Sequence, residues 1–144
     1  SGLLAACTQP VIYDQFQSIE GNQWERGKVY YFTFNIEDNR IPYDLTLAIR
    51  NNNKYPYQNL WLFYNEEPPI GALKRDTIEC MLADDYGKWY GTGISLYLSS
   101  FPLRTHYYFP YPGQYTYSFQ QGMRANELTG VQEIGLNITP SKGD

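Results

Sequence analysis

Val29-Tyr-Tyr-Phe-Thr-Phe-Asn-Ile36 carries the clearest structural signal in this chain of 144 residues. Every second position is large and apolar, and these positions are Tyr30, Phe32, Phe34 and Ile36. Successive side chains of a strand point to opposite faces of a sheet, so these four share one face, whereas a helix would need a repeat of about 3.6 residues. The segment is therefore predicted to be a β-strand with one face in a hydrophobic core.

The same alternation recurs along the whole chain. Further strands are predicted at residues 11–16, 43–50, 59–64, 77–82, 94–98, 114–120 and 134–138. Turns rich in Asn, Asp, Pro and Gly separate them, and only residues 121–128 could form a helical turn. Short strands at this spacing predict an all-β fold, an antiparallel β-sandwich of about eight strands, with a jelly roll as one form of it.

The alternation also predicts which side chains form the core. We expect buried positions at Phe32, Phe34, Leu45, Leu47, Leu60, Leu62, Leu96 and Leu136. Cys80 alternates with Ile78 and Leu82, so its thiol is expected to behave as a small apolar core residue. Trp61 lies in a strand that is apolar on both faces, and it is also expected in the core.

Length and composition restrict the class of protein. Residues 11–144 are expected to form a single β-sandwich domain, because a chain of this length buries enough surface for one core. Hydrophobic residues make up 42% and charged residues 18% of the chain, which excludes a disordered protein. The net charge of −4 argues against a nucleic-acid-binding protein. The 15 tyrosines fit the half-buried surfaces of β-sheets.

The first ten residues have a different character. Leu3-Leu-Ala-Ala-Cys7 matches the end of a bacterial lipoprotein signal, in which small residues precede the cysteine that receives the lipid. We therefore expect residues 1–10 to be a signal-peptide remnant, a lipidated Cys7 and a tether. The domain would then be anchored by lipid to a membrane of the cell envelope and would face the periplasm.

Residues for catalysis are scarce. His106 is the single histidine, and a dyad with Cys80 is disfavoured because Cys80 is expected in the core. The acidic pairs Glu66-Glu67 and Asp84-Asp85 are interpreted as a solvated loop and a turn, rather than as parts of a glycosidase or calcium site. The sequence thus predicts a protein that is not an enzyme, with no catalytic residue, no cofactor and no metal site.

An aromatic loop is the candidate binding surface. It reads Tyr107-Tyr-Phe-Pro-Tyr-Pro-Gly113, and its two prolines disfavour long strand pairing. Exposed aromatic patches usually mark interaction surfaces. We expect the contact with a protein partner to be made by Tyr107, Tyr108, Phe109 and Tyr111, with Trp89 as a neighbour. The alternative is that these rings fold over one end of the core.

Several motifs, in their order along the chain, carry a family resemblance. They are Leu4-Ala-Ala-Cys7, Val11-Ile-Tyr-Asp-Gln-Phe16, Ile49-Arg-Asn51, Tyr55-Pro-Tyr-Gln-Asn-Leu-Trp-Leu-Phe63, Leu82-Ala-Asp84, Gly87-Lys-Trp-Tyr-Gly-Thr-Gly93, and Gly122-Met-Arg-Ala-Asn-Glu-Leu-Thr-Gly-Val131 followed by Ile134-Gly-Leu136. With these motifs, which span most of its length, the chain resembles the GldH family of gliding-motility lipoproteins from the Bacteroidetes.

The resemblance implies an envelope lipoprotein associated with the gliding machinery, which overlaps the type IX secretion apparatus. It implies no catalytic activity and no cofactor, and Cys7 is the one functional position that it carries over. We therefore expect a non-catalytic, lipid-anchored interaction domain with envelope protein partners. The alternative that stays open is a carbohydrate-binding module for glycan capture, which would present flat aromatic rings beside carboxamides or carboxylates.

Overall fold

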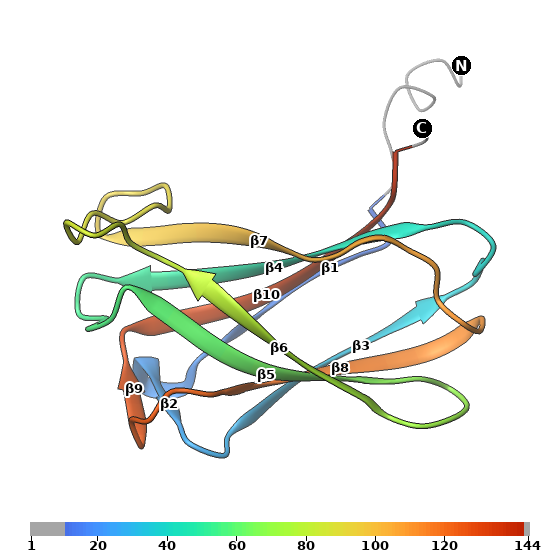
Figure 1. The fold of residues 1–144 in the computed structure, drawn as a ribbon, viewed down its shortest axis with the longest axis horizontal. Helices are drawn as coiled ribbons and strands as arrows, with labels where there is room; N and C mark the ends of the chain where they lie inside the picture. Colours follow the sequence, from blue (N-terminus) through green and yellow to red (C-terminus); the bar gives the residue numbers. More distant parts are fainter. Residues whose placement is uncertain (1–10, 143–144) are drawn as a thin grey trace.

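A computed structural model describes residues 11–142 of the chain. Two four-stranded antiparallel sheets lie face to face, and a two-stranded ribbon lies near one end of them (Figure 1). This arrangement confirms the predicted all-β sandwich, but the described residues form ten strands rather than the predicted eight or so. The predicted lipid attachment at Cys7 and the tether at 1–10 lie outside the described residues.

The first sheet has the strand order β1-β10-β4-β7. Its strands are β1 (Tyr13–Ser18), β10 (Val131–Pro140), β4 (Tyr43–Asn52) and β7 (Leu96–Tyr107), and each neighbouring pair is antiparallel. Strand β7 is much longer than predicted because it continues through Pro102. It lies at the edge of the sheet, where a proline is tolerated since one side of the strand needs no hydrogen-bond donor.

The second sheet has the order β3-β8-β5-β6. Its strands are β3 (Val29–Ile36), β8 (Gly113–Gln121), β5 (Asn59–Glu67) and β6 (Lys74–Met81). Strand β3 has the bounds that the alternation predicted. The ribbon pairs β2 (Gln23–Glu25) with β9 (Glu127–Thr129), and it follows a 3-10 turn, η2 (Glu20–Asn22). These two strands are too short to show an alternating pattern in the sequence.

Residues 121–128 form no helix, so the predicted helical turn is wrong. The Gln121 side chain donates a hydrogen bond to the carbonyl of Ala125 at 2.9 Å and accepts one from the N–H of Met123 at 2.8 Å. These bonds satisfy backbone groups without a helix. Within residues 11–142 there is also no helix with the length and apolarity of a membrane span.

The core between the sheets holds most of the predicted side chains. Buried positions include Phe32, Phe34, Leu45, Leu47, Leu60, Leu62, Cys80 and Leu136. The prediction is wrong for Leu96, which is 38% exposed because it begins the edge strand β7. It is also wrong for Trp61, which is 41% exposed. Leu60 and Leu62 occupy the inner face of β5, so Trp61 between them points outward.

Candidate functional site

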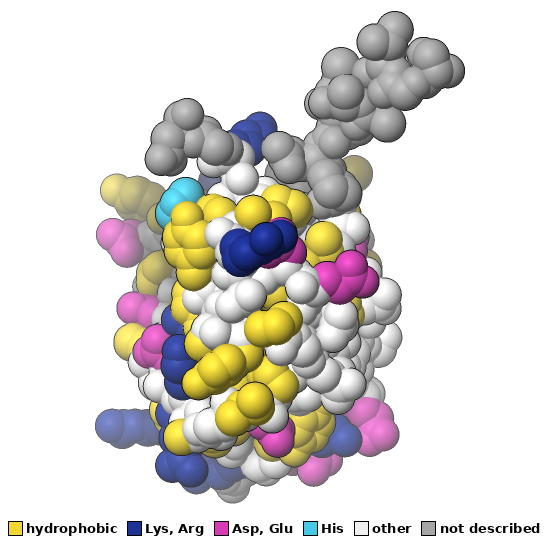
Figure 2. All heavy atoms as spheres, turned by 90° about the vertical axis from the view of Figure 1, so that its right-hand side faces the viewer, with side chains coloured by type: hydrophobic (Ala, Val, Ile, Leu, Met, Phe, Trp, Pro, Cys, Tyr) yellow, Lys and Arg dark blue, Asp and Glu magenta, His cyan; other side chains and the backbone are white. Residues whose placement is uncertain are grey.

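Three connections meet at one end of the sandwich. The β3–β4, β5–β6 and β7–β8 loops lie together at the right of Figure 1, and Figure 2 views this end, where hydrophobic side chains gather in a band across the surface. The exposed hydrophobic residues of these loops are Ile41, Ile70, Leu73, Tyr108 and Tyr111. We call these five residues the loop-end patch. It contains two of the aromatic residues that the sequence predicted as a partner surface.

Phe109 is a core residue rather than a surface residue. It is 1% exposed, and its ring centroid lies 4.7 Å from that of Tyr115 and 5.8 Å from that of Phe34. Tyr43 closes a third side at 5.7 Å. The prediction that Phe109 contacts a partner is therefore corrected, because its ring is enclosed between the two sheets. Its burial instead anchors the middle of the β7–β8 loop.

Tyr115 fixes the next part of the same loop. Its hydroxyl donates a hydrogen bond to the carbonyl of Tyr111 at 2.7 Å and accepts one from the N–H of Tyr111 at 3.0 Å. Burial raises the pKa of Tyr115, so the hydroxyl keeps the proton that it donates. Asn39 adds a hydrogen bond from its side chain to the carbonyl of Pro110 at 3.2 Å. These hydrogen bonds hold the backbone that presents the Tyr111 side chain.

A shallow hollow connects this loop with the β5–β6 loop. It has a volume of about 310 Å³ and is lined by Pro68, Ile70, Gly71, Ala72, Leu73, Lys74, Pro110 and Tyr111. Ile70 is 65% exposed beside it. The sequence predicted only a solvated loop at Glu66-Glu67, although Ile70, between Pro69 and Gly71, and Leu73 shortly after it were a signal of exposed apolar surface.

Tyr107 lies behind the patch and is half-buried. Its hydroxyl lies 3.0 Å from both carboxylate oxygens of Glu66, which has no exposed surface. Burial and the neighbouring Glu66 carboxylate both raise the pKa of Tyr107. The cations Lys74 and Arg104 approach Glu66 at 3.9 Å and 3.8 Å. Tyr107 therefore connects the two sheets at this end of the sandwich, and little of its side chain is accessible from outside.

The prediction that Glu66 and Glu67 form a solvated acidic pair is wrong for Glu66, which is buried. Strand β5 continues to Glu67, so the alternation that buries Leu62 and Tyr64 also turns Glu66 inward. Only Glu67 faces solvent. Within residues 11–142, His, Cys, Asp and Glu side chains do not gather in any group of three that could hold a metal ion.

Trp89 is not a neighbour of the aromatic loop. It lies in the β6–β7 connection at the opposite end of the sandwich, on the left of Figure 1. Its ring stacks on Tyr97 at 5.8 Å and tilts against Tyr55 at 6.5 Å. The predicted partner surface is therefore reduced to Tyr108 and Tyr111, which are 53% and 43% exposed, together with the aliphatic residues of the patch.

Comparison with known proteins gives the family. The model of the GldH lipoprotein family matches residues 11–138. A gliding motility lipoprotein GldH homolog from Christiangramia forsetii is 32% identical over 147 residues, with 96% of this chain and 90% of the relative covered. Gliding motility lipoprotein GldH from Flavobacterium johnsoniae is 29% identical over 143 residues, with 94% and 89% covered.

A solved structure, dimeric latent PorU from Porphyromonas gingivalis, aligns with a TM-score of 0.32 and 9% identity. The alignment covers 93% of this chain and 13% of PorU, and at this TM-score it carries no structural conclusion. The family match, by contrast, spans nearly the whole described domain and names the same family that the motifs in the sequence resemble. The chain belongs to the GldH lipoprotein family.

Proposed function

We propose that this protein is a non-catalytic lipoprotein of the gliding-motility machinery, and that it holds a protein partner in the cell envelope through its loop-end patch. Both relatives are named as gliding motility lipoproteins, which supports the cellular role. In this proposal Cys7 carries the lipid, the sandwich faces the periplasm, and the partner belongs to the gliding and type IX secretion apparatus.

The main support for this binding site is that the backbone of the β7–β8 loop is fixed beneath exposed aromatic rings. Tyr111 is held on its main chain by Tyr115, and the core packing of Phe109 fixes the residue next to Tyr108. Tyrosine brings large contact area with few rotatable bonds, so it concentrates binding energy at interfaces. A rigid loop of this kind loses little conformational entropy when it binds.

The patch is tested by affinity capture from solubilised envelope membranes. The bait is the full chain expressed behind a lipoprotein signal peptide, either unchanged or with Tyr108→Ser and Tyr111→Ser. A matched control replaces two other exposed tyrosines, Tyr31 and Tyr57, by serine. We expect the loop-end variant to lose the captured partner and the control to keep it. Equal recovery from both variants would place the contact elsewhere.

The anchor is tested separately. Cys7→Ala should move the protein from the membrane fraction to the soluble periplasmic fraction without changing its melting temperature, because acyl chains stabilise membrane binding and not the β-sandwich core. A variant that stays with the membrane would show that a protein contact, rather than lipid, retains it there.

A further inference from the structure

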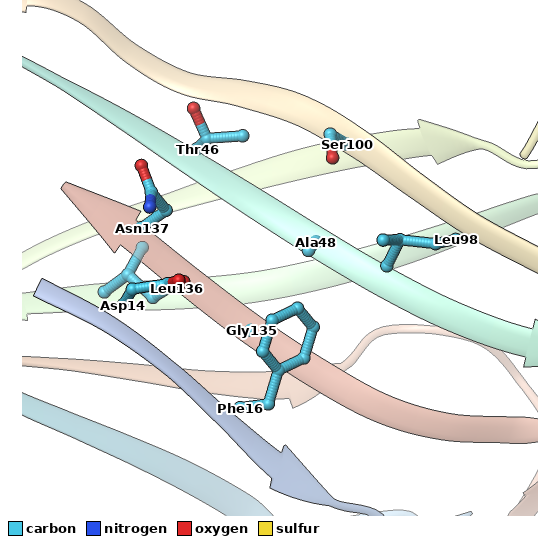
Figure 3. Close-up of a pocket in the computed structure, with 9 residues that line it drawn as sticks. All are labelled: Asp14, Phe16, Thr46, Ala48, Leu98, Ser100, Gly135, Leu136 and Asn137. Carbon is cyan, nitrogen blue, oxygen red and sulfur yellow. The ribbon is translucent and has the colours of Figure 1, made fainter. Parts of the chain in front are cut away.

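A groove crosses the outer face of the first sheet, on the side away from the core. Its floor is a row of three small residues, because Gly135 of β10 pairs with Ala48 of β4, and Ala48 pairs with Ser100 of β7. Side chains at paired positions stand side by side on one face of a sheet. This row is therefore lower than the rows on either side, and the hollow has a volume of about 230 Å³ (Figure 3).

One end of the groove is an aromatic ring. Phe16 of β1 pairs with Gly135, and its ring lies so close over the glycine that a Cβ atom there would come within 2.7 Å of it. Figure 3 shows the ring spread over the sheet beside Gly135. The side chain is nevertheless 42% exposed. The exposed face of the Phe16 ring therefore forms a flat apolar surface at one end of the groove.

The adjoining row supplies polar groups. Asp14 of β1 pairs with Asn137 of β10, and Asn137 pairs with Thr46 of β4, so the three side chains stand in line along one side of the hollow. Figure 3 shows the Thr46 hydroxyl, the Asn137 carboxamide and the Ser100 hydroxyl around it. These groups offer hydrogen-bond donors and acceptors, whereas the Asp14 carboxylate only accepts.

The charges around the groove select against an anionic ligand. Asp14 places a negative charge in the polar row. At the aromatic end the cation Arg50 lies 5.9 Å from the Phe16 ring centroid, and it is paired with Glu133 at 2.9 Å. A phosphate or sulfate would meet a carboxylate and a cation that is already neutralised.

A neutral sugar ring matches this set of groups. It has an apolar C–H surface that packs on an aromatic face, and a rim of hydroxyls that both donate and accept hydrogen bonds. Small-molecule sites combine apolar walls with a few placed polar groups in this way. We propose that the groove binds one neutral pyranose ring, stacked on Phe16 and hydrogen-bonded by Asp14, Asn137 and Thr46. This site is separate from the loop-end patch.

The test is a titration of the full chain with simple sugars, monitored through the amide NMR signals of the protein. The probes are the methyl glycosides of glucose, galactose, mannose and N-acetylglucosamine, with sodium sulfate as the anionic comparison. We expect at least one glycoside to give saturable shifts at millimolar concentration, centred on Ala48, Gly135 and Asn137, and sulfate to give none. Absence of saturable shifts with every glycoside would overturn the proposal and leave the groove as a packing site for Phe16 on Gly135.

Two groove variants and two controls make the result specific. Ala48→Leu fills the floor and should abolish the shifts, while Asn137→Ala, which leaves the floor unchanged, should weaken binding by about tenfold, the equivalent of one lost hydrogen bond to the ligand. Thr116→Leu is the control, because it places the same leucine side chain on the outer face of the second sheet. Shifts that persist unchanged in both groove variants, or that disappear equally in Thr116→Leu, would contradict the site. Tyr108→Ser with Tyr111→Ser should leave sugar binding intact, so failure of the patch and failure of the groove are distinguishable.

Discussion

The hydroxyl of Tyr117 donates a hydrogen bond of 2.5 Å to Oε1 of Glu66, and neither side chain has any exposed surface. The two residues come from neighbouring strands of the second sheet, β8 and β5. Tyr107 reaches the same carboxylate from β7 of the first sheet. Glu66 therefore joins the two layers directly behind the loops that form the loop-end patch.

Removal of this carboxylate should destabilise the sandwich. Glu66→Ala leaves the buried Tyr117 hydroxyl, the half-buried Tyr107 hydroxyl and the nearby cations without this carboxylate, so we expect a loss of about 3–5 kcal/mol in the free energy of unfolding, as for a broken buried ion pair. Chemical denaturation followed by circular dichroism measures it. Glu67→Ala is the matched control, because Glu67 faces solvent, and it should stay within about 0.5 kcal/mol. Equal effects of the two substitutions would contradict the network.

High pH should unfold the protein through its buried tyrosines. Burial raises the pKa of Tyr55, Tyr107 and Tyr117 above the ordinary value of about 10. In the unfolded chain these hydroxyls lose their protons near pH 10, whereas the folded state keeps them protonated. Stability is therefore fully present below about pH 10 and falls as the pH rises from there towards the folded pKa values.

The measurement is denaturant unfolding between about pH 8 and pH 11, with tyrosinate absorbance recorded in parallel. Tyr117→Phe should make the loss of stability at high pH less steep, because one fewer hydroxyl releases its proton when the protein unfolds. If all tyrosines ionised near pH 10 while the fold stayed intact, the buried network would be refuted.

Cys80 should be unreactive in the folded protein. Its side chain is completely buried, and desolvation raises the pKa of the thiol to about 12. Only the thiolate reacts quickly with alkylating and disulfide reagents. In a Cys7→Ser background, labelling at pH 8 should therefore require denaturant. Rapid stoichiometric labelling of the native variant would contradict the burial of this residue.

The tryptophans provide a contrast between buried and exposed positions. Trp24 is fully buried and donates its indole N–H to the carbonyl of Lys28 at 2.9 Å, whereas Trp61 is 41% exposed. Trp24→Ala should cost about 3–5 kcal/mol of stability. Trp61→Ala should cost much less, since part of its ring is in water in both states. A larger loss of stability from Trp61→Ala than from Trp24→Ala would contradict the assignment of Trp61 to the outer face of β5.

The sequence predicted where the strands lie far better than it predicted which face of a strand points into the core. Alternation located β3 to the residue, because its polar and apolar positions separate cleanly. In β5 both faces are apolar, so the pattern could not tell whether Leu62 or Trp61 faces inward. That choice depends on β6 and β8, the strands that flank β5 in the sheet.

The sites were less predictable because they depend on pairing between distant strands. The aromatic loop was located, but the enclosure of Phe109 depends on Phe34 and Tyr115, which come from other strands. The groove floor arises only when Gly135 and Ala48 come into register, and no local motif marks that pairing. Long-range register of this kind cannot be read from the alternation within one strand.

The loop-end patch is tested most directly by photo-crosslinking in intact cells. A benzophenone amino acid replaces Tyr111 in the patch or Tyr31 on the outer face of the second sheet, both exposed positions. We predict that illumination joins the Tyr111 derivative to one envelope protein of defined mass, and that the Tyr31 derivative yields no such product. A product from Tyr31 with none from Tyr111, or the same product from both, would contradict a partner site at the loop end.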